Sequence, residues 1–458
     1  MEELSIKEIR KAVGGKIVQG NPEAKVENVC IDSRILNEED LFIAIIGERF
    51  DGHSFLEEAV NKGAKAVIVD RSIKPYPNLS IIRVKDTTKA LQDLAHFNRK
   101  RYKDLKVIGI TGSVGKTTTK DMLAWVLKQK YNVLKSAGNY NNHYGLPLSL
   151  LSLEGDEDIA VLEMAMSNIG EIKRLAEIAE PEIGVVTNVG QAHLKNLDNV
   201  ANVAEAKKEL VEALPKKGVA VLNYDNKYVR EMDSVFNGDK IIYYGLKPGA
   251  DIYGKNIEHD HQNKNIKFEL SYENEKRNIL INKPGEHNIY NALAAISIAR
   301  EFDIDWNLIK ESFRNLDFSS LRLDIREKDN FTIINDSYNA NPLSMKAAID
   351  VLKENSTKRS IAILGDMLEL GPKKEEAHYE VGKYLSSQNI DILITVGELA
   401  EIIANAAEDN MKKENIFRVQ NNDEAYNILK DLIAEEDCIL VKGSRKMKME
   451  EIVQKALS

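Results

Sequence analysis

The sequence KVIGITGSVGKTTTKDML, residues 106–123, carries the strongest structural signal in the chain. An apolar, β-rich run leads into Gly112 and Gly115, and Lys116 and Thr117 then open a helical pattern. Glycines let backbone amides crowd around phosphate oxygens, and a helix N-terminus adds partial positive charge. A lysine followed by a hydroxyl residue neutralises phosphate and binds magnesium. The stretch therefore predicts a loop, residues 111–118, that binds the phosphates of ATP.

The glycine spacing of this loop departs from the commonest phosphate-loop pattern. Ile110 stands where that pattern has its first glycine, and Gly112 is the nearest useful one. The alternative interpretation is an ordinary strand–helix turn, which the order of strand, glycine, lysine and helix disfavours. The predicted phosphate-binding residues are Thr111, Gly112, Ser113, Val114, Gly115, Lys116, Thr117 and Thr118.

Strand and helix patterns alternate on both sides of the loop. Strand-like runs recur at KVIGIT, IAVLEMA, EIGVVTNVG, VAVLN and KIIYYG, with helical segments between several of them, which predicts a mostly parallel sheet. Alternating polar segments in residues 251–282 predict antiparallel hairpins on that sheet. A small α/β unit with runs NVCI, LFIAII, AKAVIV and SIIRV precedes the loop, and strand–helix repeats after residue 330 predict a Rossmann-like unit. We expect an α/β protein of three domains, residues 1–102, 103–317 and 318–458.

Metal ligands beside a phosphate loop are expected at the ends of neighbouring strands. Glu163 ends one strand-like run, and Asn188 and His193 follow the next, on the side where doubly wound sheets bind ligands. Glu163 is therefore the leading carboxylate ligand, and His193 is the candidate for a second metal, although a loop histidine is more often a packing residue. Lys207 lies in a charge-rich helical segment, where a solvated lysine is the ordinary interpretation.

Composition narrows the range of functions. The chain has 458 residues, with 63 lysines and arginines against 72 aspartates and glutamates, and its net charge of -9 includes no basic block that would follow a nucleic-acid backbone. No apolar run approaches the roughly 18 residues of a membrane helix, and the start of the chain lacks a secretory signal. We expect a cytoplasmic protein without a membrane span or a nucleic-acid partner, in which Cys30 and Cys438 are reduced structural thiols.

Several further motifs resemble the Mur ligases, the ATP-dependent amide ligases of peptidoglycan precursor synthesis. The strings TGSVGKTT, LEMAMSNIGEI, TNVGQAHL, EAKKEL and HNIYNALAA carry this resemblance over nearly the whole chain. DSYNANP, LGDMLELG, GNYNNHYGLPL and VKGSRKMKMEE resemble the family member that adds D-alanyl-D-alanine, and DSR and GERFDGHSF are similar to the UDP-sugar-binding domain. The resemblance implies a ligase that uses ATP to join UDP-MurNAc-tripeptide to D-Ala-D-Ala. We expect the protein to be a monomer.

The same resemblance implies roles for individual residues. The catalytic residues would be Lys116, His193 and Lys207, with Lys207 carbamylated. Two Mg²⁺ ions would be held by Thr117, Glu163, His193 and Lys207. Further contacts to the nucleotide would come from Asn288, Asn291, Arg322 and Asp336. The substrates would contact Ser33, Arg34, Asp51, Gly52, His53, Asn141, Asn142, Ser167, Tyr338 and Asn339. His378 and LGDMLELG would face the dipeptide or the nucleotide, and Ala165 stands where the family often has glycine.

The chemistry of amide formation limits the mechanism. A carboxylate needs a better leaving group before an amine can displace it, so the expected course is attack of the tripeptide carboxylate on the γ-phosphate, giving ADP and an acyl phosphate. The amino group of D-Ala-D-Ala then attacks the acyl carbon. Because acyl phosphates hydrolyse readily, we expect the third domain to close on ATP. The alternatives are a ligase for another amino acid or for folate, a phosphate-loop kinase or switch, and a non-catalytic binding protein derived from a ligase.

Overall fold

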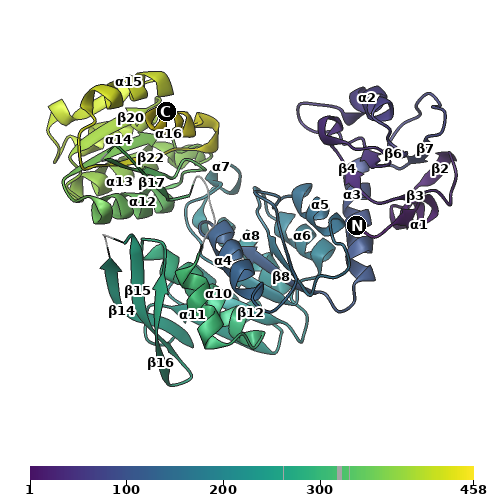
Figure 1. The fold of residues 1–458 in the computed structure, drawn as a ribbon, viewed down its shortest axis with the longest axis horizontal. Helices are drawn as coiled ribbons and strands as arrows, with labels where there is room; N and C mark the ends of the chain where they lie inside the picture. The colour runs from purple at the N-terminus through teal and green to yellow at the C-terminus, as the bar shows by residue number, and fades with distance from the viewer. Residues whose placement is uncertain (261–262, 317–321, 330) are drawn as a thin grey trace.

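The computed structural model describes residues 1–260, 263–316, 322–329 and 331–458. Three α/β parts follow one another along the chain, with the N-terminal and C-terminal parts at opposite ends of the molecule (Figure 1). The predicted fold class, three α/β domains with mostly parallel sheets, is confirmed. The boundary after residue 102 stays a prediction, and the boundary between residues 317 and 318 lies outside the described residues.

The N-terminal part is built on a five-stranded sheet of order β2-β7-β6-β5-β4 in the described chain. Strands β4 to β7, which correspond to the four predicted runs, are parallel, whereas β2 pairs antiparallel with β7. The short strands β1 to β3 were not predicted. The elements are β1 (Leu4–Ser5), α1 (Ile6–Ala12), β2 (Lys16–Gln19), β3 (Lys25–Val26), β4 (Val29–Cys30), η1 (Ser33–Ile35), β5 (Leu41–Ile43), η2 (Gly52–Phe55), α2 (Leu56–Asn61), β6 (Ala66–Val69), β7 (Ser80–Arg83) and α3 (Thr87–Arg101).

The central part contains nine described strands in the order β16-β15-β14-β13-β12-β11-β8-β10-β9. Strands β9 to β14 and β8 pair in parallel, and β14 to β16 form the predicted antiparallel hairpins. The strands are β8 (Lys106–Thr111), β9 (Val133–Lys135), β10 (Ile159–Glu163), β11 (Ile183–Val186), β12 (Val219–Asn223), β13 (Lys240–Gly245), β14 (Ile252–Asp260), β15 (Asn265–Tyr272) and β16 (Glu275–Ile281). The helices are α4 (Lys116–Leu127), α5 (Gly145–Leu151), α6 (Glu171–Ala179), α7 (Leu194–Leu197), α8 (Val200–Glu212), α9 (Lys227–Arg230), η3 (Glu231–Val235), α10 (His287–Glu301) and α11 (Trp306–Arg314).

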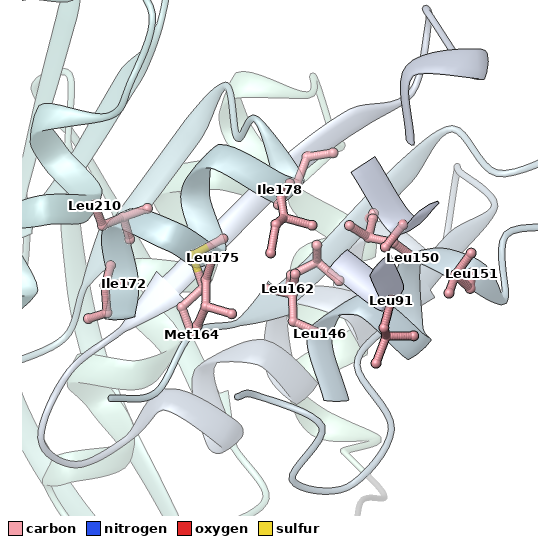
Figure 2. Close-up of a cluster of buried hydrophobic side chains, with 14 of the residues drawn as sticks. Leu91, Leu146, Leu150, Leu151, Leu162, Met164, Ile172, Leu175, Ile178 and Leu210 are labelled. Atoms are coloured by element: carbon pink, nitrogen blue, oxygen red, sulfur yellow. The ribbon is translucent and has the colours of Figure 1, made fainter. Parts of the chain in front are cut away.

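Helices cover both faces of the central sheet, which explains why its parallel strands are apolar throughout. Helices α4, α10 and α11 pack on one face, and α5, α6 and α8 pack on the other. Figure 2 shows Leu162 of β10 among Leu146 and Leu150 of α5 and Ile178 of α6. Leu91 of α3 lies in the same cluster, so the last helix before the predicted boundary packs against the central part.

The C-terminal part has a sheet of order β17-β18-β22-β19-β20-β21 over its described residues. All neighbouring strands are parallel except β17 and β18, with α12 to α14 on one face and α15 and α16 on the other. The strands are β17 (Asp324–Lys328), β18 (Phe331–Asn335), β19 (Arg359–Gly365), β20 (Ile392–Val396), β21 (Ile416–Val419) and β22 (Asp437–Lys442). The helices are α12 (Pro342–Asn355), η4 (Gly371–Lys373), α13 (Lys374–Ser387), α14 (Ala400–Ala407), η5 (Lys413–Asn415), α15 (Asn422–Leu432), η6 (Arg445–Met447) and α16 (Glu450–Leu457).

The carboxyl ends of β8, β10 and β11 meet at one edge of the central sheet. These strands are parallel neighbours, and the chain order reverses around β8, which makes this edge the switch point where doubly wound sheets bind ligands. The predicted structural thiols, Cys30 and Cys438, are both buried and free. In the part of the chain that the structure describes, no helix is long and apolar enough to cross a membrane.

Candidate active site

The phosphate loop turns sharply between β8 and α4 at two glycines. Gly112 has a φ of 154°, and a Cβ there would lie 1.8 Å from the Thr187 Oγ1. Gly115 caps α4 with a φ of 87°, and a Cβ there would lie 2.5 Å from the Asn291 Oδ1. Both positions require glycine because the backbone conformation and the close approach of a neighbour exclude a side chain.

Replacing Gly115 by alanine is expected to weaken ATP binding about 10-fold or more, because the left-handed φ costs about 1–2 kcal/mol and the methyl group pushes against Asn291. Gly170 is a matched control, since it caps α6 with a φ of 91° and a Cβ there meets nothing within 4 Å. Gly170→Ala should therefore lose stability but keep its affinity for ATP, as measured by calorimetry. Equal ATP affinities in the two variants would contradict this account of the loop.

The end of β11 holds the middle of the phosphate loop. The Asn188 side chain accepts a hydrogen bond from the Val114 N (2.9 Å) and donates one to the Val114 O (3.0 Å). The Thr187 Oγ1 donates to the same carbonyl at 2.6 Å, and the Ser113 N donates to the Asn188 O at 3.0 Å. The loop conformation is therefore fixed by protein contacts alone.

The residues present fit a phosphate group. Helix α4 begins with no acidic residue in its first turn, so its N-terminal amides and partial positive charge face the loop. The Lys116 Nζ lies over the loop and donates to the Gly112 O at 2.8 Å. Burial lowers the pKa of Lys116, and the negative charge of Glu163 opposes that shift. A glycine cradle, a free helix N-terminus and an ammonium group are the donors that a polyphosphate requires.

Glu163 connects the loop to a neighbouring segment. Its carboxylate is 1% exposed and accepts hydrogen bonds from the Thr117 Oγ1 (2.7 Å) and the Asn141 Nδ2 (2.9 Å). Among the described residues, no three His, Cys, Asp or Glu side chains form a cluster that would hold a metal ion unaided. One carboxylate and one hydroxyl nevertheless suit Mg²⁺, which uses few protein oxygens and completes its shell with phosphate oxygens and water.

Lys207 and His193 have different environments. Lys207 is 2% exposed on α8, and burial together with the positive charge of Lys116 holds its pKa well below the ordinary range. His193 has a φ of 54° just before α7, and its Nδ1 lies 3.2 Å from the Glu369 Oε2 of the C-terminal part. The positive charge of Lys116 in the phosphate loop thus acts on Lys207. His193 instead pairs with Glu369 across the junction between the central and C-terminal parts.

The predicted nucleotide contacts lie on both sides of the domain junction. Asn291, in the first turns of α10, accepts a hydrogen bond from the Thr119 Oγ1 at 3.2 Å, and Asn288 donates to the Pro284 O at 2.7 Å. The Arg322 guanidinium lies over the Tyr338 ring at 4.0 Å, and its charge acts on Lys116. The buried Asp336 accepts a hydrogen bond from the Lys442 Nζ in the C-terminal part.

The predicted substrate residues of the N-terminal part lie in and beside two short helices, Ser33 and Arg34 in η1 and residues 51–53 at η2. The Asp51 carboxylate accepts from the His53 N at 3.0 Å and lies 2.7 Å from the His53 Nδ1. Arg34 is largely exposed and pairs with Asp32 at 2.6 Å. The Ser33 Oγ donates to the Glu58 Oε2 at 2.8 Å. The buried Gly52 allows the η2 turn to approach the backbone that follows β5, because a Cβ there would lie 2.7 Å from the Ile45 N.

The other predicted substrate residues are distributed over the two remaining parts. The Asn142 Oδ1 accepts hydrogen bonds from the backbone N atoms of Tyr144 and Gly145, beside the start of α5. Ser167 and Asn339 are exposed, and the Asn339 O accepts a hydrogen bond from Lys442. Of the ten residues predicted to contact the substrates, only Asn141 hydrogen-bonds directly to a candidate metal ligand in the described structure. That ligand is Glu163.

The expectation that His378 faces a ligand is wrong. His378 does not face a ligand, because it is 0% exposed and its Nε2 accepts a hydrogen bond from the Met367 N at 2.9 Å. It supports the segment from inside the C-terminal part, while Glu369 reaches the central part. Four residues of the site were not predicted individually, although each lies within a sequence stretch quoted above: Lys120, Thr187, Glu369 and Lys442.

A doubly wound domain with a phosphate loop, flanked by two further α/β domains, defines a class of three-domain phosphate-loop proteins. Within that class, the family described as Mur ligase middle domain matches residues 110–299, the Mur ligase family catalytic domain matches residues 25–99, and the family described as Mur ligase, glutamate ligase domain matches residues 321–445. The chain belongs to the Mur ligase family.

Full-length relatives refine this assignment. The chain is 37% identical to the UDP-N-acetylmuramoyl-tripeptide--D-alanyl-D-alanine ligase of Bacillus subtilis (strain 168), over 99% of this chain and 98% of that protein. It resembles the crystal structure of MurF from Acinetobacter baumannii with a TM-score of 0.92 and 29% identity, over 100% and 99% of the two chains. It also resembles the MurF ligase of Thermotoga maritima in complex with ADP, with a TM-score of 0.82 and 29% identity, over 94% and 96% of the two chains.

Proposed function

We propose that this protein joins D-Ala-D-Ala to the terminal carboxylate of UDP-MurNAc-tripeptide and converts ATP to ADP and phosphate. The observation that carries the proposal is the coincidence of full-length similarity to ligases of that name with a phosphate loop that contacts a buried carboxylate. Thr117 follows Lys116 at the start of α4, so its contact with Glu163 would hold a metal ion beside the phosphate loop. A protein that had lost catalysis would have little reason to keep this arrangement.

The reaction proceeds in two steps. A carboxylate oxygen of the tripeptide attacks the γ-phosphorus in line, the bond to the β-phosphate oxygen breaks, and ADP leaves. The amino group of D-Ala-D-Ala then attacks the acyl carbon, phosphate leaves with the original carboxylate oxygen, and the nitrogen loses a proton. Lys116 neutralises charge on the transferring group throughout the first step.

Metal ions and a modified lysine complete the proposed site. Bound Mg²⁺ supplies charge neutralisation among the phosphate and carboxylate oxygens. Thr117 and Glu163 would hold one ion, and His193 and carbamylated Lys207 would hold a second. Carbamylation needs a neutral amine, because the nitrogen lone pair attacks CO₂ and the nitrogen then loses a proton. The lowered pKa of Lys207 favours the neutral form of the amine and so supports this step.

The remaining contacts divide between nucleotide and substrates. Asn288 and Asn291 are proposed near the adenine, and Arg322 and Asp336 would reach the nucleotide when the C-terminal part closes on it. The polar group around Asp51 and His53 is the proposed contact for the UDP moiety. Small-angle scattering tests the closure: a particle that becomes no more compact with ADP and a substrate analogue would rule it out.

A phosphate-release assay tests the proposed reaction. We expect the purified protein, given ATP, Mg²⁺ and UDP-MurNAc-tripeptide, to release phosphate only when D-Ala-D-Ala is added. Tripeptides ending in lysine and in diaminopimelate should be compared, which identifies the accepted third residue. Phosphate release with single amino acids or with folate would instead favour another amide ligase. We also propose that the protein is a monomer in the cytoplasm. Analytical ultracentrifugation tests whether it is monomeric.

A further inference from the structure

The Lys120 side chain carries its amino group into the interior of the central part. It is 1% exposed, and its Nζ donates to the Ser136 O at 2.9 Å and to the Gly138 O at 3.3 Å. The nearest carboxylate of its own helix, that of Asp121, lies 3.8 Å away. Burying an amino group costs free energy unless its hydrogen bonds are made, so the two carbonyl contacts explain why the residue is tolerated there.

The two carbonyls belong to the segment of residues 136–142, which connects β9 to α5. This segment also hydrogen-bonds to β10 and to the residues that follow it. The Ser136 Oγ accepts a hydrogen bond from the Glu163 N at 3.2 Å, and the Asn141 O accepts one from the Ala165 N at 2.8 Å. The Asn141 Nδ2 donates to the Glu163 Oε1 at 2.9 Å. The segment therefore fixes both the backbone and the carboxylate of Glu163.

These hydrogen bonds form a closed circuit that begins and ends on α4. It runs from Lys120 through residues 136–142 and Glu163 to Thr117. The second oxygen of Glu163 accepts a hydrogen bond from Thr117, which lies three residues before Lys120 on the same helix. Residues three apart on a helix share a face, so one face of α4 contacts Glu163 directly and holds the 136–142 segment behind it. Displacing Lys120 would release the segment, and with it the Asn141 side chain that orients the carboxylate.

We infer that Lys120 is a positioning residue that sets the orientation of the Glu163 carboxylate through residues 136–142. The inference rests on the proposed use of Mg²⁺ and ATP, because Glu163 is the carboxylate that would hold the ion. It assigns to Lys120 no contact with substrate or nucleotide. Its role is to pre-organise a carboxylate for the metal, so its loss should affect Mg²⁺-dependent binding more than Mg²⁺-independent binding.

The test measures ADP binding at increasing Mg²⁺ concentration by calorimetry, together with hydrogen exchange of residues 136–142. For Lys120→Met we expect the half-saturating Mg²⁺ concentration to rise about 10-fold or more, within the range seen when groups behind a metal ligand are removed. ADP binding in the presence of a chelator should stay unchanged, and the amides of the segment should exchange faster. Lys128→Met, at the exposed end of the same helix, is the matched control and should behave as the wild type.

A double-mutant cycle separates positioning from packing. Asn141→Ala interrupts the same circuit at its other end, so the double variant Lys120→Met, Asn141→Ala should need no more Mg²⁺ than the worse single variant. If Lys120→Met does not fold, Lys120→Gln keeps an N–H donor group on a shorter side chain and should show an intermediate Mg²⁺ requirement. Additive effects in the cycle, or equal losses of ADP affinity with and without Mg²⁺, would overturn the inference.

Failure of this inference and failure of the proposed function give different results. A wild-type protein that does not bind ADP in the presence of Mg²⁺ would contradict the proposed function. A wild-type protein that binds it, with Lys120→Met indistinguishable in Mg²⁺ requirement and in hydrogen exchange, would contradict only the role of Lys120.

Discussion

Lys116→Ala is expected to lower kcat/KM for the ligation by about 10³-fold or more, because the charge that this side chain supplies acts on the transferring phosphoryl group. The structure supports a direct role, since the Lys116 ammonium lies over the phosphate loop and is partly shielded from water. A charge in such a site is stabilised less by solvent and acts more strongly on a ligand. Steady-state phosphate release, with the joined peptide measured in parallel, gives the effect.

Lys128→Ala is the control for this prediction, because it removes an exposed lysine from the other end of α4. The control should retain wild-type turnover and should unfold at the same temperature. Near-normal activity of Lys116→Ala would show that residues 111–118 are not the loop that holds the transferred phosphate.

Lys207→Ala is expected to lower turnover by about 10²-fold, since it removes the proposed carbamate and its share of charge neutralisation at the second metal. Short-chain carboxylates added to the variant should restore part of the activity by occupying the space that the side chain leaves. Intact-mass measurement of the wild-type protein in bicarbonate should detect the added CO₂, and removal of bicarbonate should reduce activity.

Lys208→Ala is the matched control for Lys207, because Lys208 is the next residue of α8 and pairs with Glu205 instead. It should need no carboxylate and should keep its activity. Full activity of Lys207→Ala without added carboxylate would remove the carbamate from the mechanism.

The parts of the site that follow from local sequence were predictable. Lys116 and Thr117 stand at the start of a helix after a glycine turn, and Glu163 ends a buried parallel strand, so their positions depend on neighbouring residues and on strand order. The main strands were predictable for the same reason, because parallel strands covered on both faces are apolar throughout. The strands that were missed are short or polar, such as β9 and β17.

Contacts between distant segments were not predictable from local patterns. Lys120 is followed by Asp121 and looks like a solvated helix residue, yet it is buried because the 136–142 segment folds over it. The pairing of His193 with Glu369 depends on how the C-terminal part sits against α7, which no local pattern reports. Ionisable side chains in the interior are placed by tertiary packing, so their roles emerge only when the segments around them are known.

Isotope transfer from the tripeptide carboxylate tests the central claim most directly. UDP-MurNAc-tripeptide labelled with oxygen-18 in its terminal carboxylate should be incubated with the protein, ATP, Mg²⁺ and D-Ala-D-Ala, and the products analysed by mass spectrometry. The acyl-phosphate mechanism predicts one heavy oxygen in the released phosphate and one in the new amide of the pentapeptide product. Unlabelled phosphate, or phosphate release without a joined peptide, would contradict the proposed function.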